Sequence, residues 1–303
     1  MLKKGYLRLK KELAEKISEI TSVWMCGVIQ RNNAFSSQIY SWRDPDCTSD
    51  ILFGKTKKKS KRREIVDKIL DINRSKLEII SPKKIQFDEF KWKSEEDNCV
   101  EFFIDFETLN SNMNDVNLLS NNFDSEQKVF LVGIGFMDDN KNWEFKYFLA
   151  EDTSLESEKK VFDEFWNFVN KKCGTKKSKF YHWTGAEPIS YRKLLKRHNN
   201  IWPEINFVDL YKIFYQEPVV INGALSFSLK SIARALYKHD LIETCWNDSN
   251  PCQNGFFAMI LATRAYKKPS KSRSPIFDDI IKYNEIDCKV LWEILVYLRE
   301  NHV

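Results

Sequence analysis

Apolar residues in the first part of the chain recur at helical spacing. Four of them lie three or four residues apart within the segment 7–20: Leu9, Leu13, Ile17 and Ile20. This spacing predicts an amphipathic helix. The segment 64–72 repeats the pattern, and the stretch between is compatible with two short helices around a turn at Gly27. We therefore expect a small, mainly α-helical domain over residues 1–90, followed by a polar linker at 91–98.

From residue 99 onward, strand patterns come first and then alternate with helical ones. Five segments have the composition and alternation of strands: 100–106, 129–136, 143–149, 179–183 and 207–210. Turn residues at 138–140 join the second and third of these into a hairpin. Apolar residues at helical spacing occupy three further segments: 156–169, 190–197 and 276–299. Three antiparallel strands followed by strands alternating with helices predict an α/β fold, with helices packed against a mixed sheet over residues 99–303.

One segment of this second part has a different character. Residues 110–127 are polar and rich in asparagine, so we expect an exposed loop there.

The overall composition is that of a globular protein, with 43% hydrophobic and 14% aromatic residues. No apolar run is long enough to span a bilayer, and the N-terminal residues enter a mixed amphipathic pattern directly, so we expect neither a membrane span nor a signal peptide. The seven cysteines form no CxxC pair and are odd in number. This argues for reduced thiols in an intracellular compartment, cytoplasmic or nuclear.

Positive charge is concentrated near the N-terminus. Residues 1–98 hold 22 of the 48 Lys and Arg but only 15 of the 43 Asp and Glu. Seven cations fall in the nine residues 55–63: Lys55, Lys57, Lys58, Lys59, Lys61, Arg62 and Arg63. Such a run suits contacts to nucleic-acid phosphates or a nuclear-import signal, and a solvated loop that keeps the protein soluble explains it equally well.

Two carboxylates interrupt the first strand of the second domain. Asp105 and Glu107 lie two residues apart in the run 100–108, so their side chains point to the same face of the strand. Like charges on one face repel, and burial makes their ionised forms costly unless a cation lies between them. The pair is therefore either solvated on a wet sheet face or holds a metal ion, and the pattern alone leaves both readings open.

Three later acids also occupy informative positions. Asp287 lies on the core-facing stripe of the last helix, one turn after Tyr283, which is an uncomfortable place for an acid without a ligand. Glu187 precedes Pro188 at a helix start, where the helix dipole alone accounts for it. Asp209 precedes a short helix and is interpreted as its N-cap or, alternatively, as a ligand.

Taken together, these motifs resemble a known family. Asp105-Phe106-Glu107 on a first strand, an acid after a later strand and Tyr-x-x-x-Asp on a final helix are similar to the DEDD exonucleases of the RNase H-like superfamily. More narrowly, five segments resemble the YprB-type RNase H-like domain found behind RecB-like nuclease domains: FFIDFET, YHWTGAEP, FVDLYKIF, SLKSIARAL and YNEIDCKVLWEI.

The likeness covers residues 99–303. Residues 15–50 and 64–85 resemble the segment that precedes this domain in such fusions, where a helix-hairpin-helix-like element is common, although only Gly27 marks the hairpin here. The resemblance implies the tail of that architecture standing alone, or a shortened form of it.

The resemblance implies a role for each acid. Asp105 and Glu107 would be the first-motif metal ligands, Glu187 the second-motif acid and Asp287 the last ligand, with Tyr283 holding the attacking water. Most DEDD exonucleases have Asp in the second motif, so Glu187 is a departure by one methylene. The implied cofactor is a pair of divalent ions, Mg²⁺ or Mn²⁺, and the implied reaction is 3′–5′ phosphodiester hydrolysis.

The implied partner is DNA or RNA with a free or single-stranded end. Lys230 resembles a family position near the site that touches phosphate, although a surface lysine is an equal reading. Phe106, Tyr181 and Trp183 are candidates for stacking on a terminal base, or else core residues of the sheet.

Two other functions remain open from the sequence. A structure-specific endonuclease would use the same metals and the basic first domain. A non-catalytic nucleic-acid-binding module would keep the fold but has no physical reason to hold like charges together.

Overall fold

The computed structural model describes residues 2–58, 60–75, 78–110, 127–247, 249–267 and 274–303. These residues form two compact units, each assembled from separate stretches of the chain. The first comprises Met1–Phe87, Tyr211–Ile242 and Glu300–Val303, and the second comprises Asp88–Leu210 and Glu243–Arg299. Residues 211–242 thus group with the first unit, although they lie inside the second sequence domain; the boundary at 91–98 stays a prediction.

The first unit is mainly helical, as expected for the N-terminal region. Its helices are α1 (Leu2–Ile17), the 3₁₀ helix η1 (Ile20–Ser22), α2 (Val28–Ser36), α3 (Ser49–Phe53), α4 (Lys61–Arg74), α7 (Tyr211–Gln216) and α8 (Leu229–Lys238). Two short strands, β1 (Ile80–Ser81) and β7 (Val220–Ile221), pair antiparallel. Helix α4 buries Ile65, Ile69 and Ile72, the apolar stripe predicted from the sequence, together with Val66 and Leu70.

The predicted stripe on α1 behaves differently. Leu9, Leu13 and Ile17 are 61%, 57% and 49% exposed, whereas Ile20 is fully buried and belongs to η1 instead of α1. The helix therefore forms where the spacing predicts it, but it ends three residues early.

A five-stranded mixed sheet forms the centre of the second unit. Its strands are β2 (Cys99–Asn110), β3 (Gln127–Met137), β4 (Trp143–Leu149), β5 (Lys177–His182) and β6 (Phe207–Asp209), in the order β4-β3-β2-β5-β6. Strands β2, β3 and β4 are antiparallel neighbours, while β5 pairs parallel with β2 and β6 parallel with β5. The predicted mixed sheet, with three antiparallel strands followed by parallel ones, is confirmed.

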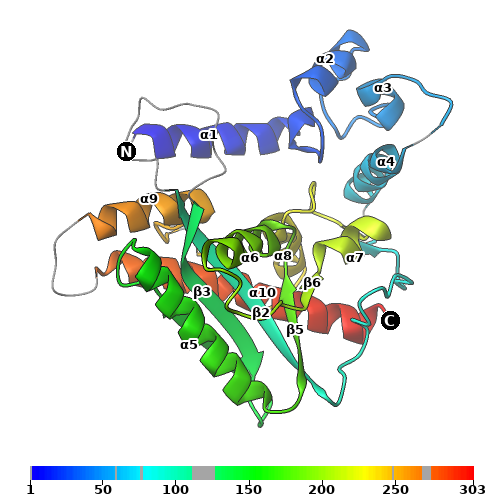
Figure 1. The fold of residues 1–303 in the computed structure, drawn as a ribbon. Coiled ribbons are helices and arrows are strands. Elements are labelled where there is room, and N and C mark those ends of the chain that lie inside the picture. The colour runs from blue at the N-terminus through cyan, green and yellow to red at the C-terminus, as the bar shows by residue number, and fades with distance from the viewer. Residues whose placement is uncertain (1, 59, 76–77, 111–126, 248, 268–273) are drawn as a thin grey trace. The chain divides into compact units, whose positions relative to one another are not determined.

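Helices cover both faces of this sheet (Figure 1). They are α5 (Leu155–Cys173), α6 (Ala186–Arg197), α9 (Gly255–Tyr266) and α10 (Ile276–Asn301). Phe102 and Phe106 point to the α5 face, where they meet Phe168 and Phe162. Because strand residues alternate, Asp105 and Glu107 point to the opposite face, which α10 covers. This alternation places the acidic pair beneath the last helix.

The structure departs from the sequence prediction in the extent and number of its elements. Helices α3, α8 and α9 and the pair β1–β7 were not predicted, and α10 extends to Asn301. The predicted loop 110–127 falls almost wholly on residues 111–126, which lie outside the described ranges. Within those ranges, no helix combines the length and apolarity that a bilayer crossing requires.

Candidate metal centre

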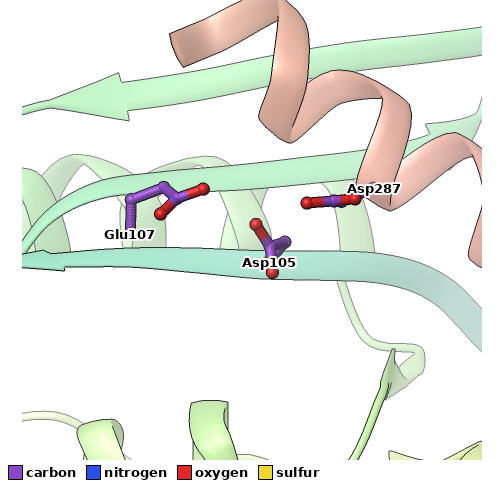
Figure 2. Close-up of side chains that lie close together, drawn as sticks. All are labelled: Asp105, Glu107 and Asp287. Atoms are coloured by element: carbon purple, nitrogen blue, oxygen red, sulfur yellow. The ribbon is translucent and has the colours of Figure 1, made fainter. Parts of the chain in front are cut away.

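Three carboxylates meet between β2 and α10. Asp105, Glu107 and Asp287 each offer an oxygen, and these atoms lie within 4.8 Å of one another. Figure 2 shows the side chains of Asp105 and Glu107 on one strand and that of Asp287 on the helix, all pointing into the same space. Glu107 and Asp287 are buried, and Asp105 is partly buried. Three of the four acids assigned from the resemblance are thus brought together by the fold.

The strand and the helix each contribute through their own periodicity. Asp105 and Glu107 are presented by the alternation of β2, which continues until a register shift between Glu107 and Thr108. Asp287 lies one turn beyond Tyr283 on the stripe of α10 that faces the sheet, and both are buried. The site therefore follows from two regular elements and needs no special loop.

Neutral donors hold two of these acids, and the sequence analysis missed both donors. Asn284 Nδ2 donates to Asp105 Oδ2 at 2.6 Å and to the Asp105 main-chain oxygen at 3.1 Å. Trp246 Nε1 donates to Asp287 Oδ1 at 2.8 Å. A polar residue next to Tyr283 on an otherwise apolar helix face was an available signal for Asn284; nothing in the pattern around Trp246 marked it.

A glycine on the facing strand makes room for Asn284. Gly133 pairs with Asp105 across β2 and β3, and a Cβ at Gly133 would lie 1.6 Å from Asn284 Oδ1. No side chain larger than hydrogen fits there without displacing the amide. The sequence shows Gly133 only as one of two glycines within a strand, and a glycine there in general marks a close approach of another group.

The hydroxyl of Tyr283 joins the acidic group. Burial raises the pKa of Tyr283 well above its usual value, and the charges of Asp287, Asp105 and Glu107 and a hydrogen bond with Asp287 add to this effect. The hydroxyl accordingly stays protonated and acts as a hydrogen-bond donor.

The N-terminus of α9 approaches Glu107 from another side. A Cβ at Gly255, the first residue of α9, would lie 3.7 Å from Glu107 Oε2. The partial positive charge of a helix N-terminus favours a carboxylate nearby. Asn254 caps this helix by accepting from the Phe257 N–H, and an Asn before an apolar run was the signal that could have predicted α9.

Glu187 lies outside the group of three. It begins the first turn of α6, is only 5% exposed, and has Oε2 3.3 Å from His182 Nδ1. The geometry of that contact is not that of a hydrogen bond, and both atoms are buried without a hydrogen-bond partner among the described residues. A buried carboxylate oxygen without a donor is costly, and a bound cation would offset that cost. Its role as a metal ligand stays a prediction.

Asp209 supports the loop that leads to Glu187. Its Oδ1 accepts from the Thr184 N–H at 2.9 Å, and Thr184 has a positive φ of 66°. This left-handed residue turns the chain from β5 toward α6. Asp209 therefore stabilises the turn after β5, a role that neither sequence reading anticipated.

The stacking candidates belong to the core. Phe106, Tyr181 and Trp183 are all buried, and the Tyr181 hydroxyl donates to Glu101 Oε1 at 2.8 Å. Tyr181 stacks on Phe103 inside the sheet, with ring centroids 5.2 Å apart. The alternative reading as core residues therefore fits these three.

The predicted nucleic-acid-binding cations lie in the first unit and differ in availability. The Arg63 guanidinium is buried and donates to the main-chain oxygens of Ser49, Phe53 and Gly54 and to Asp50. It binds both ends of α3, which leaves it poorly suited to bind phosphate.

The other cations of the run are less buried. Arg62 donates to the Met25 oxygen and lies over the Phe53 ring, and Lys61 donates to the Gln216 oxygen. Lys55, Lys57 and Lys58 are exposed, Lys59 lies outside the described residues, and Lys230 on α8 is partly buried. Phosphate binding by these residues stays a prediction.

The donor set of the acidic group fits a hard divalent cation. Mg²⁺ and Mn²⁺ prefer oxygen ligands, and this site offers three carboxylates. Asn284 Oδ1 and Glu187 Oε2 are further buried oxygens without a hydrogen-bond partner among the described residues. Asp105, Glu107 and Asp287 would hold the cation, whose charge would offset their mutual repulsion.

The comparisons with known proteins agree with this site. The family model described as the RNase H superfamily matches residues 102–299 and therefore spans Asp105, Glu107 and Asp287. No curated protein and no solved structure matches the chain significantly.

Proposed function

The chain belongs to the RNase H superfamily, and from this premise we propose that it is a metal-dependent nuclease that shortens nucleic acid from a 3′ end. The observation that carries the proposal is the convergence of Asp105, Glu107 and Asp287. Membership of the superfamily indicates hydrolysis of nucleic-acid phosphodiesters; the 3′–5′ polarity comes from the resemblance to the DEDD exonucleases and their YprB-type branch.

Each residue of the site has one role in the proposed hydrolysis. Asp105, Glu107 and Asp287 hold the cations, Mg²⁺ or Mn²⁺, and we assign Glu187 to the same set. A pair of divalent cations, when bound, activates water as a nucleophile at neutral pH and stabilises the charge that develops on the phosphate. Tyr283 keeps its proton, and we assign its hydroxyl to orient the attacking water through a hydrogen bond.

End-labelled substrates test the polarity. A linear single strand labelled at its 5′ end should yield a ladder of products shortened one nucleotide at a time, and a circular strand should resist. An internal cut that also opens the circle would indicate a structure-specific endonuclease instead of an exonuclease. If Asp105→Ala retains near wild-type activity with Mg²⁺ or Mn²⁺, the acidic group is not the catalytic site.

Glu187 needs its own pair of variants. If it is a ligand, Glu187→Asp should be impaired and partly restored by Mn²⁺, which tolerates looser geometry than the near-ideal octahedron that Mg²⁺ demands. Glu187→Ala should be inactive. Full activity of Glu187→Ala would mean that Glu187 is not a ligand and only stabilises the start of α6.

A further inference from the structure

Two of the three clustered acids have one oxygen engaged by an uncharged donor. Asn284 Nδ2 bridges the side chain and main chain of Asp105, so it fixes both the position and the rotation of that carboxylate. Trp246 Nε1 holds Oδ1 of Asp287. In each case a neutral N–H binds one carboxylate oxygen.

The two donors are themselves held firmly. Asn284 is fully buried on α10 against Gly133. Trp246 lies on the segment after α8, which a second acid of α10 ties down. Glu293 accepts from the Glu243 N–H at 3.0 Å, and from the Thr244 N–H at 2.8 Å and hydroxyl.

Helix α10 therefore holds residues 243–246 at two points. Glu293 accepts hydrogen bonds from Glu243 and Thr244, and Asp287 accepts one from the indole N–H of Trp246. Because Glu293 and Asp287 belong to one rigid helix, the place of Trp246 relative to Asp287 is set by the fold.

We propose that Asn284 and Trp246 are positioning residues that orient Asp105 and Asp287 for the cation before it binds. A neutral donor orients a carboxylate without cancelling its charge, whereas a lysine or arginine in the same place would compete with the cation. Hydrogen-bond partners of metal ligands typically contribute 10–100-fold to metal affinity. This inference rests on the proposed function, because it takes the acidic group to be a cation site.

Mn²⁺ binding to the full-length protein, measured by electron paramagnetic resonance without nucleic acid, tests the proposal. Trp246→Phe removes the N–H and keeps an aromatic ring, and Asn284→Leu removes the amide and keeps its size. Each should weaken Mn²⁺ binding by about 10–100-fold. Cleavage lost at low metal concentration should return at high concentration, because all carboxylates remain.

A matched control separates this role from general packing. Trp143 Nε1 is also buried but has no hydrogen-bond partner among the described residues, so Trp143→Phe makes the same ring change without removing a bond to an acid. Its Mn²⁺ affinity should equal that of the wild type.

The outcomes distinguish the two proposals. If the wild type does not bind Mn²⁺, the proposed function fails. If the wild type binds Mn²⁺ and a folded Trp246→Phe protein binds it equally well, the positioning role of Trp246 is overturned and its N–H is only a core contact. The same result for folded Asn284→Leu overturns the role of Asn284. Should Asn284→Leu not unfold cooperatively, Trp246→Phe alone decides the proposal.

Discussion

Substituting Gly133 by alanine is the sharpest structural perturbation of the site that leaves every acid in place. The new Cβ would meet Asn284 Oδ1 at 1.6 Å and Cγ at 2.8 Å, distances that no packing tolerates. Asn284 is fully buried, so its amide must swing away from Asp105 and give up two hydrogen bonds. One bond to a charged oxygen and one to a neutral oxygen contribute roughly 2 and 1 kcal/mol, which predicts a loss of about 3 kcal/mol in the free energy of unfolding.

Chemical denaturation and Mn²⁺ titration of the same samples measure the two consequences. Gly135→Ala, on the same strand as Gly133, is the matched control, because the three atoms nearest to its Cβ all belong to the Trp143 ring, the first at 2.1 Å. Both variants should be destabilised by overpacking. Only Gly133→Ala should bind Mn²⁺ more weakly, by tenfold or more. Equal Mn²⁺ affinity in the two variants would refute the link from Gly133 through Asn284 to Asp105.

Three further predictions address stability, catalysis and binding. Glu158 is buried and accepts from the Arg197 guanidinium and the Val129 N–H, so Glu158→Gln should lower the free energy of unfolding by about 3 kcal/mol; an unchanged denaturation midpoint would contradict this. Tyr283→Phe should reduce the cleavage rate about fivefold through one lost hydrogen bond of about 1 kcal/mol; an unaffected rate would remove Tyr283 from the mechanism. Neutralising three exposed lysines should reduce the slope of log affinity against log salt by about 2 for a long single strand, and an unchanged slope would leave the run as a solubilising or import signal. The three are Lys55, Lys57 and Lys58.

The elements that build the site were predictable from local pattern. Alternation in β2 places Asp105 and Glu107 on one face, and helical spacing in α10 places Asp287 on its core-facing stripe. Each element is long and strongly periodic, so neighbouring residues repeat the same information. What the spacing alone cannot show is that these two faces oppose each other; for that the resemblance to a known family was needed.

The contacts of the two donors were not predictable because they join residues that are distant in sequence. Trp246 lies on an aperiodic segment whose path is set by main-chain bonds to Glu293, about fifty residues later. In the sequence, Asn284 is a polar residue on a helix of mixed polarity. Its side chain fits only because Gly133, on strand β3, has no side chain. Local propensity carries no information on either contact.

Arg63 shows the same limit for charged residues. In sequence it is one of seven cations in a run that suits phosphate binding. In the structure it binds both ends of α3 with four hydrogen bonds from the first turn of α4. Charge density predicts a basic surface; which members of the run are exposed depends on the fold.

If the acidic group binds the cation that hydrolysis requires, Asp287→Asn should abolish cleavage and leave the fold intact. The amide keeps the shape of the side chain and can still accept the Trp246 N–H, but it removes one of three clustered negative charges. With Mg²⁺ or Mn²⁺, the wild type should degrade a labelled single strand and should stop when the metal is chelated. The Asp287→Asn protein should melt at the same or a higher temperature and show no cleavage above background. Cleavage by the folded variant at the wild-type rate would contradict the account.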